Sequence, residues 1–456
     1  MIPFLVISFF IAIIIIGFSS NKNNSISDYL YSGRKLTVPS LIATLVTTWY
    51  GGINEIGNQT INHGIVVWLY FGICYYIAAI LYAYFIAPRV IDKNYRSIPI
   101  TIYESYGKIP GLISLITILL FLIPAPYLLM LGQLISEIFS INQTEAIILG
   151  LIFSTAYTLK GGFSSIIKTD RIQFIFMFFG FMMLSGFLFF SDQYGIGLIQ
   201  NLYQRESHLF QIPGNMEWSL IIAYSSLALI TFLDPSFHQR TFAGKNLKTV
   251  QKSIVLSVIC WFIFDLITIS SALFYLEITF INGNIIDTAS PYIALAKDVF
   301  QNYPFLMGIF FISILSVVMS TIDSYTFLSS MTLRYDLNTI IGRKTNIQTI
   351  RDTIVIILII SFILSTFFDN ALDYWYYFGT YVIVSTLFPL ICTLFDIKIK
   401  SVTLMMITSV SATLFWDLSG ITLAPSIYIG LSINLLILLY QIIVNNHNNH
   451  NNHNHN

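Results

Sequence analysis

Hydroxyl and carboxylate side chains lie close together inside the long apolar segment 303–332. Ser320, Thr321, Asp323 and Ser324 follow one another there within a few positions. Hard cations such as sodium take several oxygen ligands, and hydroxyl and carbonyl oxygens suit them. Neighbouring positions on a helix point about 100° apart, so Ser320 and Thr321 can share an ion only near one helix edge. The alternative is that both hydroxyls bond to carbonyls one turn earlier, as Ser and Thr in membrane helices often do.

Further acidic residues stand within or beside apolar segments. Asp265 follows the run Cys260-Trp-Phe-Ile-Phe. An unpaired charge in lipid is expensive, so an acid inside a membrane segment is a functional candidate by default. Asp265 could hold a cationic solute or relay a proton; alternatively it stays protonated or pairs with a hydroxyl such as that of Thr268. Glu55 and Asp234 allow the same interpretations.

The composition requires lipid around most of the chain. The 456 residues are 56% hydrophobic and only 10% charged, whereas soluble domains carry roughly 25% charged residues. A lipid bilayer is therefore the expected environment. The net charge is zero, which excludes the basic footprint of a nucleic-acid-binding protein. The cysteines Cys74, Cys260 and Cys392 have no paired spacing and are expected to be packing residues.

Apolar stretches of about 20 residues can each cross the hydrocarbon core, and they predict an all-α membrane protein with about thirteen transmembrane helices. They cover residues 2–18, 39–57, 64–88, 110–138, 145–160, 171–191, 217–234, 250–278, 303–332, 352–369, 371–393, 401–419 and 424–444. The first stretch lacks the flanks of a signal peptide, so we expect a retained span. The Asn/His run 445–456 is expected to be a disordered tail, with metal binding by its histidines as the alternative.

Basic residues predict the orientation of these spans. With the N-terminus outside, the connections on the cytoplasmic side and their flanks hold 20 of the 22 lysines and arginines, and only Arg205 and Lys297 lie elsewhere. Cytoplasmic connections of membrane proteins carry such an excess of basic residues. We therefore expect a multi-pass protein of the inner cell membrane, with the N-terminus outside and the C-terminus in the cytoplasm.

Two of the spans are poor continuous helices. Span 39–57 contains the pair Gly51–Gly52, and span 217–234 runs into Asp234-Pro235. Paired glycines loosen a helix and proline removes a backbone donor, and the freed backbone is tolerated in a membrane only where it lines a cavity or binds something. Broken segments at matching positions of two halves indicate an inverted-repeat transporter. Ordinary kinks are the alternative.

Other functional classes have less support. The histidines outside the tail, His63, His208 and His238, are scattered at span ends, and no HExxH, Ser/His pair or phosphate loop occurs. We therefore do not expect an enzyme. A sensor would carry a soluble output domain, yet no connection exceeds about 25 residues on these span boundaries. A channel is a further alternative, although broken helices in both halves fit alternating access better.

Four motifs, in order along the chain, resemble the sodium:solute symporter family, whose members carry sugars, proline, sialate, pantothenate and choline. Ser32-Gly-Arg-Lys-Leu36 is similar to the family's lead-in before the second span. Gly161-Gly162 with Thr169-Asp170-Arg-Ile-Gln173 resembles the GG…TDxxQ signature. Gln239-Arg-Thr-Phe-Ala-Gly-Lys245 resembles the QR…A.K element, and 317–324 resembles the ninth-span sodium motif. Together they cover residues 28 to about 336.

The resemblance implies a fold and an activity. The fold would be a LeuT-like core of two inverted five-helix repeats, residues 39–191 and 217–393, within a single transmembrane domain 1–444. The activity would be secondary active transport, in which a small organic solute enters the cell together with sodium. A proton-coupled carrier is the alternative.

The resemblance also implies sodium ligands. The main site would use the carbonyls of Ala43, Val46 and Val317 and the hydroxyls of Ser320 and Thr321. In some members the aspartate that matches Asp170 forms a second site with ninth-span residues, which here include Asp323 and Ser324 besides Ser320. Asp323 stands where some carriers have a serine and adds a charge. As an alternative, Asp170 is a solvated carboxylate beside Arg171.

The solute is harder to assign. Leu227 and Ile230 stand where sugar carriers have amide and aromatic groups, and Leu45 stands where proline carriers have an aspartate, so both substrates are disfavoured. The stretch 47–52 resembles the TWxGG segment of choline carriers, where an aromatic box would hold a quaternary ammonium through cation–π attraction. An organic cation is thus an alternative substrate class, although packing aromatics are common in this chain. The expected solute site consists of Trp49, Tyr50, Gly51, Gly52, Trp68 and Tyr75.

Overall fold

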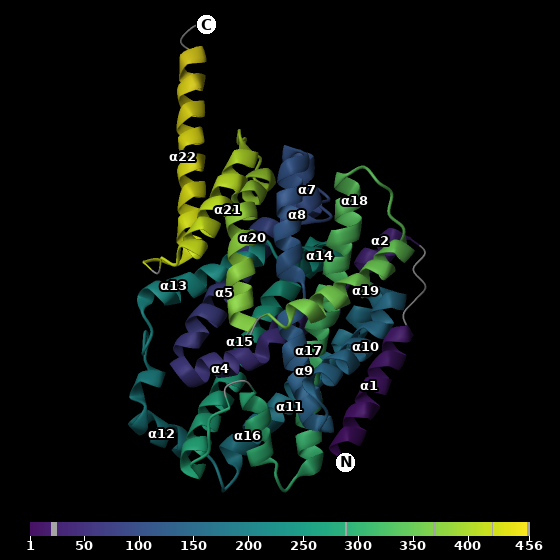
Figure 1. Ribbon diagram of the computed structural model, residues 1–456, viewed down its shortest axis with the longest axis vertical. Helices are drawn as coiled ribbons and strands as arrows, with labels where there is room; N and C mark the ends of the chain where they lie inside the picture. The colour runs from purple at the N-terminus through teal and green to yellow at the C-terminus, as the bar shows by residue number, and fades with distance from the viewer. Residues whose placement is uncertain (20–24, 288–289, 368–370, 422, 454–456) are drawn as a thin grey trace.

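The computed structural model describes residues 1–19, 25–287, 290–367, 371–421 and 423–453, and within these ranges the protein is built from helices (Figure 1). In this part of the chain the only β geometry is an isolated bridge between Leu36 and Gly244. The first helix begins at the lower end of the view and the last helix ends at the upper end. The expected all-α class is confirmed.

Long apolar helices make up most of the described chain. Nine are long and apolar enough to cross a membrane, and the apolar helices Ile2–Phe18 and Ser426–Gln441 are shorter. Large apolar side chains such as Phe190, Phe415 and Ile152 are exposed on the outside, as expected where lipid rather than water surrounds a protein. The chain is an integral multi-pass membrane protein. The number thirteen itself stays a prediction. The nine are Trp68–Asp92, Lys108–Phe139, Phe163–Phe190, Trp218–Ala243, Leu247–Asn282, Pro304–Ile340, Ile347–Leu364, Ala371–Leu394 and Val402–Ser419.

The first expected interruption lies at paired glycines. Helix α3 (Val38–Trp49) ends in a single 3₁₀ turn, η2 (Tyr50–Gly52), and α4 (Ile53–His63) continues from there. A Cβ at Gly51 would overlap the side chain of Thr321, and one at Gly52 would overlap Trp375. Only glycine therefore lets the neighbouring helices come this close to the interruption.

The second expected interruption lies at a proline. Helix α13 (Trp218–Ser226) passes into a 3₁₀ segment, η6 (Leu227–Phe232), and α14 (Pro235–Ala243) starts after a break. The Asp234 side chain accepts a hydrogen bond from the backbone N–H of Ser236 and caps the new helix, and Pro235 suits the first helical position because its missing N–H needs no partner there. The sequence therefore predicted both breaks correctly.

Three long helices enclose the first broken helix. Helix α3 packs against α11 (Phe163–Phe190), α15 (Leu247–Asn282) and α17 (Pro304–Met331), and α11 and α17 pack along each other. Helix α17 is buried almost throughout, so its polar side chains must find partners on neighbouring helices. This arrangement brings both broken helices against one polar face of α17.

The remaining elements complete the bundle. One expected span, 110–138, is divided at Pro124 into α8 (Lys108–Leu122) and α9 (Ala125–Phe139), because proline removes a backbone donor. Helix α22 runs as far as His453, into the segment expected to be disordered, since extending an existing helix is easier than starting one. These elements are α1 (Ile2–Phe18), α2 (Ile26–Tyr31), η1 (Ser32–Arg34), η3 (Trp68–Ile73), α5 (Cys74–Leu81), η4 (Tyr82–Ile86), α6 (Ala87–Asp92), α7 (Ile98–Tyr106), α8 (Lys108–Leu122), α9 (Ala125–Phe139), α10 (Gln143–Gly161), α12 (Ile196–Arg205), η5 (Ser207–Phe210), α16 (Pro291–Val299), η7 (Thr332–Asp336), α18 (Leu337–Ile340), α19 (Ile347–Leu364), α20 (Ala371–Leu394), α21 (Val402–Ser419) and α22 (Ser426–His453).

Candidate functional site

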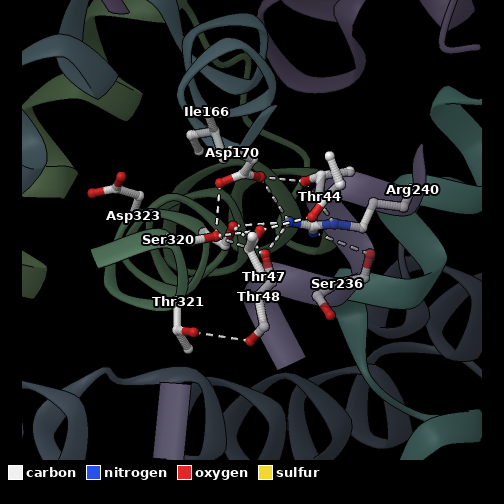
Figure 2. A network of polar contacts seen from close by, with 12 residues as sticks. Thr44, Thr47, Thr48, Ile166, Asp170, Ser236, Arg240, Ser320, Thr321 and Asp323 are labelled. Atoms are coloured by element: carbon white, nitrogen blue, oxygen red, sulfur yellow. Dashed lines mark hydrogen bonds and ion pairs between the residues drawn. The ribbon is translucent and has the colours of Figure 1, made fainter. Parts of the chain in front are cut away.

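The hydroxyl of Thr321 joins α17 to the end of α3. Its Oγ1 donates to the backbone oxygen of Thr48 at 2.9 Å, and its distance to the oxygen of Val317, one turn earlier on α17, is 3.3 Å. The shorter contact therefore crosses between the helices (Figure 2), and Thr321 also packs against Gly51 at the interruption. A hydroxyl that bonded only within its own helix would lie closer to the oxygen of Val317 than to that of Thr48.

The neighbouring hydroxyl, Ser320, reaches the same broken helix. Its Oγ lies 2.9 Å from Thr47 Oγ1, and Thr47 donates in turn to the backbone oxygen of Ala43 at 2.8 Å. Val46 lies on the same helix and is completely buried. Ser320 and Thr321 thus contact Thr47 and Thr48 of α3, and Ala43 and Val46 are buried residues of the same helix.

Asp170 of α11 adds a carboxylate to this group of hydroxyls. Its Oδ1 accepts a hydrogen bond from Ser320 Oγ at 2.7 Å, and its Oδ2 accepts one from Thr44 of α3. The same oxygen lies 3.9 Å from Nη2 of Arg240. Asp170 has no exposed surface. The alternative of a solvated carboxylate beside Arg171 is therefore wrong, because the charge partner comes from α14.

Arg240 is buried among the same hydroxyls. Its side chain is 1% exposed, and Nη2 donates to Thr48 Oγ1 at 2.7 Å and to Ser324 Oγ at 2.8 Å. Its Nε donates to Thr44 Oγ1 at 3.1 Å and its Nη1 to the backbone oxygen of Ser236 at 3.3 Å. The sequence counted this arginine among the cytoplasmic basic residues and missed its place in the site. Its position in the QR element was the one available signal.

Asp323 lies apart from this network although it is on the same helix. Its two carboxylate oxygens accept hydrogen bonds from Ser154 and Tyr157 of α10. In Figure 2 its carboxylate points away from Asp170. The three residues expected to form a second sodium site are therefore divided: Asp170 and Ser324 meet at Arg240, and Asp323 faces α10.

A cavity lies on the other side of the broken helices. Residues of both interrupted helices line it, together with side chains of α9, α15 and α20. Aromatic rings form much of its wall, with Trp49 and Tyr75 4.9 Å apart and Tyr127 and Trp375 5.7 Å apart between ring centres. The lining residues are Trp49, Tyr50, Gly52, Ile56, Phe71, Tyr75, Phe121, Tyr127, Leu227, Ile230, Asp234, Asp265, Tyr325, Trp375 and Gly379.

Two carboxylates reach this cavity. Asp265 of α15 accepts hydrogen bonds from the phenol of Tyr50 at 2.8 Å and from the phenol of Tyr76. The expected hydroxyl partner, Thr268, instead contacts backbone oxygens of its own helix. Asp234 caps α14 through the N–H and hydroxyl of Ser236, at 2.7 and 2.9 Å. Neither carboxylate has a lysine or arginine within ion-pair distance in the described part of the chain.

The expected solute residues are mostly brought together. Trp49, Tyr50, Gly52 and Tyr75 line the cavity, whereas Gly51 and Trp68 are not among its lining residues. Gly51 instead packs against Thr321, and Trp68 Nε1 donates to the Tyr76 phenol at 3.3 Å. Sequence reasoning missed the lining residues that later helices contribute, Tyr127, Tyr325 and Trp375. Nothing in the sequence indicates that these three side chains face the same cavity.

A family profile covers this part of the chain. The profile of the sodium:solute symporter family matches residues 29–395. This range includes both broken helices, the Asp170–Arg240 pair and the cavity-lining residues. The four motifs that suggested this family from the sequence all lie inside it.

Similar proteins were found among curated proteins and solved structures. The chain is 26% identical to the sodium/proline symporter of Haemophilus influenzae over 69% of its own length and 66% of that transporter. It is 25% identical to high-affinity choline transporter 1 of Drosophila melanogaster over 42% of its own length and 32% of that protein. Its fold matches a Na⁺-coupled sialic acid symporter, solved in a substrate-bound outward-open state, with a TM-score of 0.80, 16% identity and 97% of both chains covered. The match to the first of these relatives thus spans about two thirds of that protein's length.

Proposed function

The chain belongs to the sodium:solute symporter family, and on this basis we propose that it is a secondary active transporter that carries a small organic solute into the cell together with sodium, by alternating access. The observation that carries this proposal is the 2.9 Å contact from Thr321 to the Thr48 carbonyl, where α17 meets the interrupted helix. Carbonyl oxygens freed by a broken helix and hydroxyls on the facing helix are suitable ligands for a coupling ion.

The proposed sodium ligands are the carbonyls of Ala43, Val46 and Val317 and the hydroxyls of Ser320 and Thr321. All of these oxygens are neutral, and such oxygens suit a hard cation. Thr321 donates to the Thr48 carbonyl of α3, and Ser320 donates to Asp170. Each hydroxyl keeps lone pairs that can face an ion. Binding of sodium here would hold α3 and α17 together.

Direct sodium binding tests this assignment. We expect the purified protein to bind ²²Na⁺, and Ser320→Ala and Thr321→Ala to weaken the affinity. Ser316→Ala is the matched control, because Ser316 is equally buried on α17 but donates to Ile312 of its own helix. Unchanged sodium affinity in both site variants would remove the assignment.

For the solute, we propose an organic cation of the kind that choline transporters carry. The cavity combines aromatic rings with Asp234 and Asp265, and the residues that line it include no lysine or arginine. Aromatic faces and carboxylates attract an organic cation. A solute with only a carboxylate would face repulsion from both acids. The similarity to a choline transporter of Drosophila melanogaster agrees with this class.

A thermal-shift screen in sodium identifies the class. Quaternary amines, amino acids, carboxylates and sugars are compared on the purified protein. A solute that binds only the folded state should stabilise it by about 2.7 kcal/mol at roughly 100 times its dissociation constant. A shift with a carboxylate or sugar and none with amines would reject the organic cation.

Proton coupling is the second candidate mechanism. Asp323 is a fully buried acid whose described partners are hydroxyls, and Asp265 has only phenols. Such an acid can accept a proton where no basic side chain balances its charge. Uptake into vesicles with a proton gradient and no sodium, abolished by Asp323→Asn, would favour this mechanism over sodium coupling.

We also propose the orientation and the repeat boundaries. The N-terminus would face outside and the C-terminus the cytoplasm of a cell with this protein in its inner membrane, and residues 39–191 and 217–393 would form the two repeats. The charge distribution along the sequence supports this orientation. A reporter that is active only outside the cytoplasm, fused after Asn456, should be inactive, and the same reporter at the Gly195–Gly197 connection should be active.

A further inference from the structure

We infer that the guanidinium of Arg240 occupies the second cation position beside the proposed sodium site, so that this chain binds a single sodium ion. The inference rests on the proposed sodium coupling and adds its stoichiometry. It concerns the position between Asp170 and Ser324, two of the residues that the family resemblance offers for a second sodium site, next to Thr48.

The guanidinium already uses the oxygens that a second ion would need. Nη2 of Arg240 donates to the hydroxyl oxygens of Thr48 and Ser324 at 2.7 and 2.8 Å and lies 3.9 Å from Asp170 Oδ2. A sodium ion bound to the same oxygens would stand almost in contact with this nitrogen. Two positive charges so close together in a buried site repel each other strongly. Arg240 and a second sodium therefore exclude each other.

The negative charge of Asp170 is balanced by Arg240. Among the described residues, Asp170 is the only carboxylate within ion-pair distance of Arg240, and the carboxylate of Asp234 is bound to Ser236. Asp323 faces Ser154 and Tyr157 of α10 and adds no negative charge here. With the pair neutral, a sodium ion at the first site adds one positive charge to a set of neutral oxygens. A second ion would find no further described carboxylate within ion-pair distance of Arg240.

Local structure holds Arg240 in place. Its Nη1 donates to the Ser236 oxygen in the first turn of its own helix, at 3.3 Å, and its guanidinium lies 5.5 Å from the ring centre of Phe163. Asp234 and Pro235 determine where α14 starts. The break in the seventh span thus sets the position of the guanidinium relative to α3 and α17.

The test is the number of ²²Na⁺ ions bound per molecule of the full chain in detergent, measured at saturating sodium. We expect one for the wild type and two for Arg240→Gln, because the unpaired Asp170 then attracts a cation. The double variant Arg240→Gln/Asp170→Asn should return to one. Arg343→Gln removes an exposed arginine and, as a control, should bind one.

Each outcome decides a different statement. Two ions in the wild type, or one ion in a folded Arg240→Gln protein, overturns the inference. No sodium bound by the wild type contradicts the proposed function instead. If Arg240→Gln does not fold, the count in the wild type decides: one ion agrees with the inference, and two overturn it.

Discussion

The two sides of the broken helices use the same acidic residue type in opposite ways. On one side, Asp170 has no exposed surface and is matched by Arg240, and hydroxyls take up the remaining hydrogen bonds. On the other side, Asp265 reaches a cavity walled by aromatic rings and is held by two phenols, with no arginine or lysine in ion-pair distance among the described residues. The first carboxylate has a basic partner within the protein, whereas the second has only phenols and can interact with whatever enters the cavity.

This difference separates the two proposed ligands. An ion site made of carbonyl and hydroxyl oxygens beside a neutral pair suits a small hard cation. A cavity of aromatic faces, with carboxylates that no described lysine or arginine contacts, suits a larger, weakly hydrated cation. Both sites share the interrupted helix α3–α4, with Gly51 facing Thr321 on the ion side and Gly52 facing Trp375 in the cavity. A movement of this helix would therefore change the geometry of both sites.

The largest expected difference is in stability. Asp170→Asn leaves Arg240 buried without its partner and should destabilise the protein by about 3–5 kcal/mol. Asp265→Asn should cost only about 1 kcal/mol, because the amide oxygen still accepts from the phenols and no buried cation is left unpaired. Unfolding of both variants in the same detergent measures the contrast. Equal losses of stability would mean that pairing with Arg240 does not make Asp170 more important to the folded state than Asp265.

The next effect concerns sodium affinity. Thr321→Val keeps the shape of the side chain and removes the hydroxyl, and we expect sodium to bind at least about tenfold more weakly, since even indirect partners of metal ligands contribute this much. Thr326→Val is the control on the same helix, because that hydroxyl is buried and has no hydrogen-bond partner in the described structure. Binding of choline without sodium should be the same in both variants. A parallel loss of choline affinity would show that the two sites are not separable.

A smaller effect is expected in the cavity. Trp49→Ala removes a ring face and should weaken choline binding by about 0.5–2 kcal/mol, the range of a cation–π contact. Trp416→Ala is the control, because Trp416 donates to the backbone oxygen of Ala424 and does not line the cavity. Sodium affinity should stay unchanged in both. Choline binding that is equal in the two variants would place the solute elsewhere.

The smallest effect distinguishes two glycines of the cavity wall. Gly379→Ala should stabilise the protein by about 0.4–1 kcal/mol, because a helical alanine restricts the unfolded chain and its Cβ would meet Leu227 at an ordinary 3.5 Å. Gly52→Ala should instead destabilise, since its Cβ would overlap Trp375. Melting temperatures of the two variants give the sign of each change. A stabilising Gly52→Ala would show that the interruption tolerates a side chain.

Much of the architecture follows from the sequence alone. Apolar stretches predicted the membrane helices, and Gly51–Gly52 and Asp234–Pro235 predicted where two of them break, because backbone geometry at glycine and proline is a local property. The Ser320–Thr321 pair was also found in this way, since hydroxyls in an apolar run are visible without a structure. The family resemblance grouped Asp170 with Ser320, and these side chains are hydrogen-bonded at 2.7 Å; an ion bound there stays a prediction.

Only the tertiary structure decided which charged and polar groups meet. Arg240 is at the end of a span in the sequence yet buried against Asp170, Asp323 turns to Tyr157 rather than to Asp170, and Asp265 takes Tyr50 rather than Thr268. Hydrophobic periodicity shows which face of a helix is buried but not which neighbour that face meets. The partner depends on how far each helix is shifted and rotated against the next, and packing of the whole bundle sets these values. The pairing of charges at both sites is therefore a property of the assembled helices.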